Sequence, residues 1–309
     1  MVMSSDNREA PLVLSNLTKK YGESRGITNI NLSLKRGEIF GFLGPNGAGK
    51  STTIKTIMNF QAPTSGKIIV FGLDSIKESV SIKQNIGYLA GELEMYNHLT
   101  GKQILEFLGS FYNKLGWEYV TELADRFNAE LNKKVSLLSK GNKQKIGIIQ
   151  AFMHKPKLLI LDEPTSGLDP LMQEEFFKLL AEVKISGSTV FFSTHNIYEV
   201  QKIADRAAFI RNGQIIATED IKKINQIGLH KFVIHFADTL KQSQLIDIEN
   251  IDSIKINGKI AQISVRGSIN SLIKQLAKYN VISIEQQETN LEDIFLKYYQ
   301  ESKSKNENS

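Results

Sequence analysis

The stretch Gly44-Pro45-Asn46-Gly47-Ala48-Gly49-Lys50-Ser51 decides the fold, because it fits the pattern G-x-x-x-x-G-K-[ST]. It follows the β-rich run EIFGFL (38–43) and precedes a helical pattern over 50–59, which is the context that this pattern requires. Glycines let backbone N–H groups turn inward around phosphates, and the helix start adds unsatisfied donors. Lys50 can neutralise phosphate charge, and the Ser51 hydroxyl can ligate Mg²⁺. The predicted nucleotide site comprises Gly44, Pro45, Asn46, Gly47, Ala48, Gly49, Lys50, Ser51 and Thr52.

Around this loop, short apolar runs alternate with helical patterns from residue 11 to about 218. The runs that we expect to form a buried, mostly parallel sheet are 38–43, 67–72, 86–90, 157–162 and 188–194. Helical spacing lies between them, for example over 103–111 and 173–183. Asn212-Gly213, within 207–217, is typical of a two-residue type I′ hairpin turn. This order predicts an α/β domain with helices packed on a sheet.

The pattern changes near 218–229, and a smaller α+β module is expected beyond it. Its expected elements are a strand over 230–236, a hairpin at Asn257-Gly258, a helix over 268–279, a strand over 281–285, a helix from Asn290 and a polar tail over 303–309. We therefore predict two domains, residues 1–225 and residues 226–309. The first should contain a helical subdomain at about 92–155.

The composition excludes several classes of protein. The chain has 309 residues, a formal net charge of +5 and 41% hydrophobic residues, as is ordinary for a globular protein. It has no cysteine, which excludes disulfide scaffolds, thiolate zinc sites and cysteine nucleophiles. No apolar run reaches the roughly 18–20 residues that cross a bilayer, and the first ten residues lack the apolar core of a signal peptide. The positive charge is too small and too scattered to indicate nucleic-acid binding.

Residues 158–163, LLILDE, form an apolar run that ends in two acids. Asp162 should lie at the carboxyl end of the sheet, where ligands bind in such folds, and hold Mg²⁺ through water. Glu163 is placed to polarise the attacking water in phosphoryl chemistry. Taken alone, the run is equally typical of a buried strand that enters a surface turn with solvated acids, so the remaining motifs have to decide.

Further motifs occur in the order and spacing of one known family. Leu138-Ser139-Lys140-Gly141-Asn142 resembles LSGGQ, the signature of the ATP-binding subunits of ABC transporters. Ser166-Gly167-Leu168-Asp169 resembles their D-loop, and His195 resembles their switch histidine. Tyr21 matches the aromatic residue that stacks on adenine, although a core tyrosine would look the same. The resemblance covers roughly residues 11–218, and the signature is its most specific part because most other P-loop NTPases lack it.

The resemblance implies an ABC-type P-loop NTPase that uses ATP and Mg²⁺, with Glu163 and His195 as catalytic residues. The nucleotide-binding residues that it adds are Tyr21, Ser139, Gly141, Asn142 and Asp169. Ser139 and the N–H of Gly141, at the start of a helix, form a second anion site. One protomer cannot use both anion sites on one ATP, and the family therefore clasps two ATP molecules in a head-to-tail dimer. The implied partners are a second ATP-binding subunit, in a homo- or heterodimer, and an integral membrane permease subunit.

The sequence departs from the family pattern in two places. Lys140 replaces the second signature glycine, and Asn142 replaces the glutamine, while the essential serine and the following glycine remain. The glutamine of the Q-loop, expected after IGYL, is missing, so that either Gly91 leaves that position without a ligand or Glu92 substitutes for it at Mg²⁺ or water. We favour Glu92 as this third metal-site residue. Beyond it, Met95, Tyr96 and Leu99 either line a groove for the membrane subunit or belong to the core of the helical subdomain.

The resemblance is greatest to exporter ATPases of the drug, peptide-antibiotic or surface-export type, which work with a separate membrane subunit. We therefore expect a transport-coupled ATPase that is peripheral on the cytoplasmic face of the cell membrane, with no nucleic-acid partner. The alternative is a soluble ABC ATPase that acts on the ribosome or on DNA. The ribosome-acting kind carries two cassettes and the DNA-repair kind a long coiled coil, neither of which occurs here. A P-loop switch or kinase is disfavoured by the signature.

Overall fold

The protein is described by a computed structural model that covers residues 10–22, 24–112, 115–221, 229–240, 245, 248–266 and 268–287. The chain divides into two compact units between Glu219 and Asp220. The expected domain boundary at residue 225 lies outside the described residues and stays a prediction. Among the described residues, no helix has both the length and the apolar character to cross a membrane.

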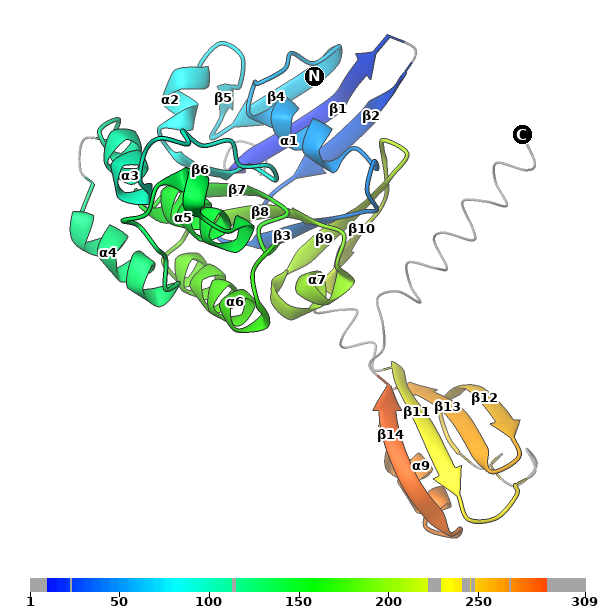
Figure 1. Ribbon diagram of the computed structural model, residues 1–309. Helices are drawn as coiled ribbons and strands as arrows, with labels where there is room; N and C mark the ends of the chain where they lie inside the picture. The colour runs from blue at the N-terminus through cyan, green and yellow to red at the C-terminus, as the bar shows by residue number, and fades with distance from the viewer. Residues whose placement is uncertain are drawn as a thin grey trace. The chain divides into compact units, whose positions relative to one another are not determined.

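A six-stranded sheet forms the centre of the first unit and has the order β10-β9-β3-β8-β7-β6 (Figure 1). Its strands are β3 (Ile39–Leu43), β6 (Ile86–Leu89), β7 (Leu158–Asp162), β8 (Thr189–Thr194), β9 (Arg206–Arg211) and β10 (Gln214–Asp220). The pairs β3–β8, β3–β9, β7–β8 and β6–β7 are parallel. Every residue of β3, β7 and β8 is buried, as continuous apolar runs predict for a sheet covered on both faces.

One expected strand of this sheet belongs elsewhere, and the prediction for 67–72 was wrong in this respect. Its residues fall largely in β4 (Ser65–Val70), which lies in a separate four-stranded sheet of order β2-β1-β4-β5. The other strands of that sheet are β1 (Leu12–Tyr21), β2 (Ser24–Ser33) and β5 (Leu73–Asp74). Strand β4 pairs antiparallel with β1 and β5, and only its last three residues are buried. An apolar run of that length does not by itself reveal the direction of the neighbouring strand.

Helices cover the central sheet, and several begin at side-chain caps. They are α1 (Lys50–Ile57), α2 (Ser79–Lys83), α3 (Gly101–Gly109), α4 (Trp117–Arg126), α5 (Lys140–Phe152), α6 (Pro170–Ile185) and α7 (Ile197–Ile203), with a 3₁₀ turn η2 at Val135–Leu137. Thr100 and Gln103 form a capping box, which starts α3 before the expected residue 103. Asp169 caps α6 and Pro170 follows it, so this helix is longer than the expected 173–183.

Aromatic packing fixes the sheet against its helices. The ring of Phe191 on β8 lies 6.1 Å from that of Phe40 and 5.3 Å from that of Phe42, both on β3. On the helical side, Phe152 of α5 meets Phe176 of α6 with ring centres 6.2 Å apart. Buried aromatic side chains contribute large apolar areas and hold their neighbours at fixed distances. These contacts hold β3 firmly beside β8 and α5 beside α6.

The second unit is an α+β module with an antiparallel sheet of order β12-β13-β11-β14. Its elements are β11 (Leu229–Phe236), β12 (Ile251–Asn257), β13 (Ile260–Arg266), α9 (Asn270–Leu276) and β14 (Val281–Gln287). Asn257 pairs with Ile260, so the turn residues are Gly258 and Lys259 rather than the expected Asn257-Gly258. Of these turn residues, Gly258 alone has a positive φ, of 62°, which corresponds to a type II′ turn. The expected helix from Asn290 and the tail over 303–309 lie outside the described residues.

His154, just after α5, makes the stability of the first unit sensitive to acid. Its Nε2 donates to the carbonyl oxygen of Ile86 at 3.1 Å, since a carbonyl can only accept, and its ring stacks on Tyr112. Its Nδ1 is buried without a hydrogen-bond partner among the described atoms. Burial lowers the pKa of His154 from 6.5 to about 4, against the opposing effect of the Ile86 hydrogen bond.

We predict that this histidine lowers the free energy of unfolding as the pH falls from about 6.5 toward 4, where the unfolded chain binds a proton that the folded chain excludes. The loss should be about 1 kcal/mol by pH 5, because the ring is partly exposed. His154→Gln keeps a donor for Ile86 and cannot titrate. Urea unfolding at pH 7 and pH 5 should show a smaller decrease for this variant. Equal decreases for the two proteins would contradict the prediction.

Candidate active site

The phosphate loop joins the end of β3 to the start of α1, as the sequence predicts. Gly47 and Gly49 have φ values of 76° and 107°, which glycine adopts without strain. At Gly44, a Cβ would lie 2.4 Å from the carbonyl oxygen of Ile210, so no larger residue fits. Lys50 is only 5% exposed, and its Nζ donates to the carbonyl oxygen of Gly44 at 2.7 Å. The ammonium group is thus held over the loop.

The end of β7 presents two acids in different environments. Asp162 is buried and accepts a hydrogen bond from the Ser193 hydroxyl on β8. Glu163 has a φ of 50°, in the left-handed region that residues other than glycine seldom occupy. Its N–H donates to the carbonyl oxygen of Ser193 at 3.2 Å. Such strained residues persist only where the surrounding structure holds them, and they gather at functional sites.

The carboxylate of Glu163 connects the phosphate loop to His195. Its Oε1 lies 3.1 Å from Lys50 Nζ, and its Oε2 lies 2.6 Å from His195 Nδ1. The strand register brings these groups together, because Leu43 is aligned with Thr194 and Asp162 with Ser193. Each functional residue therefore follows a parallel strand at the same edge of the sheet, where ligands bind in α/β folds.

A pocket of about 1260 Å³ opens over this cluster. The predicted site residues that line it are Asn46, Gly47, Gly49, Lys50, Ser51, Thr52, Glu92, Asp162, Glu163 and His195. Lys55 and Lys140 also line it, so it combines cations for phosphate with carboxylates for a metal ion. Tyr88 lies in its wall, where burial and the charge of Asp162 raise the pKa of Tyr88 to about 12 and keep its hydroxyl protonated.

Gly91 and Glu92, where the family pattern has the Q-loop glutamine, form a segment that lies beside Asp162. A Cβ on Gly91 would stand 3.2 Å from Asp162 Oδ2, so Gly91 brings the backbone close to this acid. Glu92 is exposed and lines the pocket next to it. The geometry is compatible with Glu92 as a ligand of a metal ion or water, which stays a prediction.

The remaining residues of the predicted nucleotide site do not line the 1260 Å³ pocket. Gly44, Pro45 and Ala48 belong to the phosphate loop but do not line the pocket. Tyr21 is 44% exposed, and its hydroxyl donates to Gln61 Oε1. Gln61 Nε2 in turn donates to the carbonyl oxygen of Thr52 at 2.9 Å, which ties Tyr21 to α1.

The signature segment starts α5 and packs against the D-loop of the same chain. Ser139 caps the helix and accepts a hydrogen bond from the N–H of Asn142 at 3.2 Å. A Cβ on Gly141 would lie 2.7 Å from the carbonyl oxygen of Gly167, so this position requires glycine. Asp169 caps α6 through Met172 N–H at 3.0 Å.

Asn142, the third predicted residue of the signature segment, is bound to the loop before α5. It is buried, and both polar atoms of its side chain bind the backbone of Glu130, Oδ1 to the N–H at 3.0 Å and Nδ2 to the carbonyl oxygen at 3.3 Å. Its side chain therefore anchors the start of α5, and its role in nucleotide binding stays a prediction. The sequence alone could not show this, because Glu130 reaches Asn142 only through the folding of the loop before the signature.

Two buried polar residues that the sequence analysis did not predict, Ser193 and Gln144, bind the segment that carries Asp162 and Glu163. The Ser193 hydroxyl donates to the Asp162 carboxylate and accepts from the N–H of Glu163, and Gln144 of α5 donates to the carbonyl oxygen of Pro164 at 2.7 Å. Both are buried. No local pattern distinguishes them from other polar residues, since their partners come from separate strands and loops.

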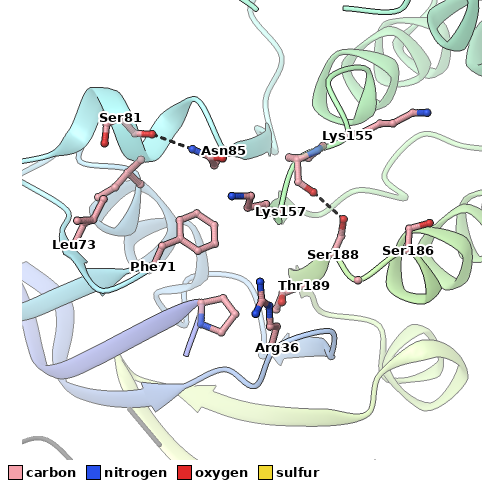
Figure 2. A pocket seen from close by; sticks show the side chains of 14 residues that line it. Arg36, Phe71, Leu73, Ser81, Asn85, Lys155, Lys157, Ser186, Ser188 and Thr189 are labelled. Carbon is pink, nitrogen blue, oxygen red and sulfur yellow. Dashed lines mark hydrogen bonds between the residues drawn. The ribbon is translucent and has the colours of Figure 1, made fainter. Parts of the chain in front are cut away.

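A second hollow, of about 800 Å³, lies at the opposite ends of the strands (Figure 2). Phe71, Lys157 and Arg36 line this hollow (Figure 2), and Lys157 immediately precedes β7. Both cations are exposed, and no residue of the phosphate loop lines this hollow. Phosphate-binding chemistry therefore assigns the nucleotide to the first pocket.

Comparison with known proteins agrees with this geometry. Residues 27–166 match the family described as ABC transporter. The linearmycin resistance ATP-binding protein LnrL of Bacillus subtilis is 32% identical over 301 residues, which cover 92% of this chain and 97% of that protein. The chain belongs to the ABC transporter ATP-binding proteins. The predicted family and P-loop fold are thereby confirmed, and the first unit is an ABC-type ATPase domain.

Other relatives show how far the similarity extends. The bacitracin transport ATP-binding protein BcrA of Bacillus licheniformis is 33% identical, with 92% of this chain and 95% of BcrA covered. The ABC transporter ATP-binding protein YbhF of Escherichia coli is 36% identical over 222 residues, 69% of this chain, which span only 38% of YbhF. A solved dimeric ATP-binding cassette in a post-hydrolysis state with ADP and Pi is 27% identical, with a TM-score of 0.63 and coverage of 68% of this chain and 98% of that one.

We predict that Lys50→Ala weakens ATP binding, because it removes the cation held over the phosphate loop. The dissociation constant from calorimetry should rise by about tenfold or more, as expected for a lost hydrogen bond to a charged group. Lys157→Ala, in the second hollow, is the matched control and should leave the affinity unchanged. Equal affinities for the two variants would remove Lys50 from the nucleotide site.

Proposed function

We propose that this protein is the ATP-binding and ATP-hydrolysing subunit of an ABC exporter and drives transport through a separate membrane subunit. The observation that supports it best is the position of Glu163, between the lysine of the phosphate loop and His195. This arrangement places a general base beside a phosphate cradle. The relatives named for bacitracin transport and linearmycin resistance support an export role for the whole chain.

In this mechanism the chain binds phosphates with the N–H groups of the loop and with Lys50. Glu163 accepts a proton from the water that attacks the terminal phosphate, and His195 orients Glu163 through the 2.6 Å contact. Removal of that proton strengthens the nucleophile, and the cations of the pocket stabilise charge that develops on the phosphate oxygens.

Mg²⁺ fits the donors that are present. Ser51, Asp162 and Glu92 line the same pocket and offer the oxygen ligands that Mg²⁺ prefers. The described residues contain no group of three His, Cys, Asp or Glu that could hold a metal ion alone, so phosphate oxygens and water would complete the coordination. The bound ion would neutralise phosphate charge, while Ser51 and Asp162 hold it in place.

We further propose that two copies, or this chain and a second ATP-binding subunit, sandwich two ATP molecules. Ser139 and the N–H of Gly141 would contact the terminal phosphate bound by the other subunit. Asp169 and the D-loop would lie in the same interface, and Tyr21 would stack on the adenine. The dimeric solved relative supports this arrangement.

The membrane subunit would dock on the helical subdomain. Tyr96 is 59% exposed there, and Met95 and Leu99 are partly exposed in the same segment. Exposed aromatic and methionine side chains are typical of protein interfaces. We propose that the protein is peripheral at the cytoplasmic face of the membrane, where ATP is available.

A soluble ABC ATPase that acts on the ribosome or DNA is not favoured. The relatives described above are ABC transporter proteins, and the described residues within 50–139 form short helices and strands instead of a long coiled coil. Co-purification separates the two functions. A multi-span membrane protein that stays bound to the tagged chain supports the exporter, whereas specific association with ribosomes would contradict it.

We predict that Glu163→Gln retains ATP binding and lowers the turnover number by about a hundredfold or more, because the amide cannot accept the proton of the attacking water. Glu118→Gln, in the first turn of α4, serves as the control and should hydrolyse ATP normally. Phosphate release and calorimetry measure the two properties separately. Near-normal turnover in Glu163→Gln would reject Glu163 as the activating carboxylate.

A further inference from the structure

Two pairs of side chains join the loop after β7 to the segment after β8. The first pair faces the pocket and consists of Glu163 and His195, 2.6 Å apart. The second pair is buried, and in it Thr165 Oγ1 donates to Glu199 Oε1 at 2.6 Å. Thr165 follows Glu163 in the same loop, and Glu199 follows His195 at the start of α7. The buried pair therefore joins the same two segments as the catalytic pair.

The burial of Glu199 makes this pair unusual. Its side chain is 4% exposed, and its Oε2 has no hydrogen-bond partner among the described residues. Burial raises the pKa of the Glu199 carboxyl, the Thr165 and Thr194 hydroxyls oppose this rise, and the charges of Glu163 and His195 act in opposite directions. A carboxyl that is buried this deeply is costly. An apolar residue would pack better at position 199, so the presence of a hydrogen-bond acceptor there requires an explanation.

The loop between these pairs is also held from its other side. Gln144 of α5 donates to the carbonyl oxygen of Pro164, which lies between Glu163 and Thr165. Glu163 has a strained backbone, and a residue in that conformation is stable only when its neighbours fix it. Gln144 and Glu199 together supply buried hydrogen bonds on the two sides of this segment.

We propose that Glu199 is a positioning residue, which fixes the loop through Thr165 and so sets the contact between Glu163 and His195. The proposal rests on the proposed role of Glu163 as the activating carboxylate. Glu199 itself does not line the nucleotide pocket. Its loss should therefore slow the chemical step and leave ATP binding intact.

Two substitutions break the buried hydrogen bond from its two ends. Glu199→Leu removes the acceptor at similar volume, and Thr165→Val removes the donor hydroxyl. Each should lower kcat by about tenfold, because small displacements of a catalytic group are costly. The ATP dissociation constant should stay within about twofold of the unmodified protein. Glu199→Gln keeps an acceptor oxygen and should restore most of kcat, which makes it the conservative control.

The double variant Thr165→Val with His195→Ala distinguishes a positioning role of the buried pair from a merely structural one. If the buried pair acts by setting the Glu163–His195 contact, Thr165→Val should lower kcat only slightly in a chain that already carries His195→Ala. If Thr165→Val only loosened the domain, it would lower kcat by the same factor in the unmodified chain and in the His195→Ala chain. That result would overturn the proposal.

Full kcat in Thr165→Val would also overturn it, and this variant decides the question if Glu199→Leu does not fold. Failure of the proposed function looks different. Normal turnover in Glu163→Gln would refute the role of Glu163, whereas a loss there together with normal turnover in Thr165→Val would refute only the positioning role of Glu199.

Discussion

The contact of one carboxylate with two partners is the constraint on which the rest of the site depends. Glu163 lies against Lys50 of the phosphate loop on one side and against His195 on the other. The three residues come from distant parts of the chain and meet only because β3, β7 and β8 are neighbours in one parallel sheet. In the proposed mechanism, the phosphate that Lys50 binds and the water that Glu163 activates would therefore lie next to each other.

The rigidity of this arrangement comes from buried groups behind the pocket. Aromatic rings pack β8 against β3, and the Ser193 hydroxyl binds the Asp162 carboxylate and the N–H of Glu163. Gln144 connects the signature helix to the loop that carries Glu163, so these two segments of the chain are held together. In the proposed mechanism, a movement of the signature helix can in this way reach Glu163.

Local sequence patterns predicted the parts of the site whose function is set by adjacent residues. The phosphate loop, the two acids that end LLILDE and the helix start at Ser139 all lie in short, contiguous segments. Properties that depend on distant partners were not predictable. Strand 67–72 pairs with an antiparallel sheet, Asn142 is bound by the backbone of Glu130, and Ser193 and Glu199 find their partners only in the folded chain. In the second unit, the position of the hairpin turn depended on the register of β12 against β13.

The central claim is that ATP is bound between two subunits, each of which supplies half of the phosphate contacts. Light scattering of the purified protein, blocked in hydrolysis by Glu163→Gln, tests it most directly. At saturating ATP and Mg²⁺ we expect a particle of twice the monomer mass, and Ser139→Ala in the same background should return it to the monomer. Monomers under these conditions, in the presence of the membrane subunit as well, would contradict the claim.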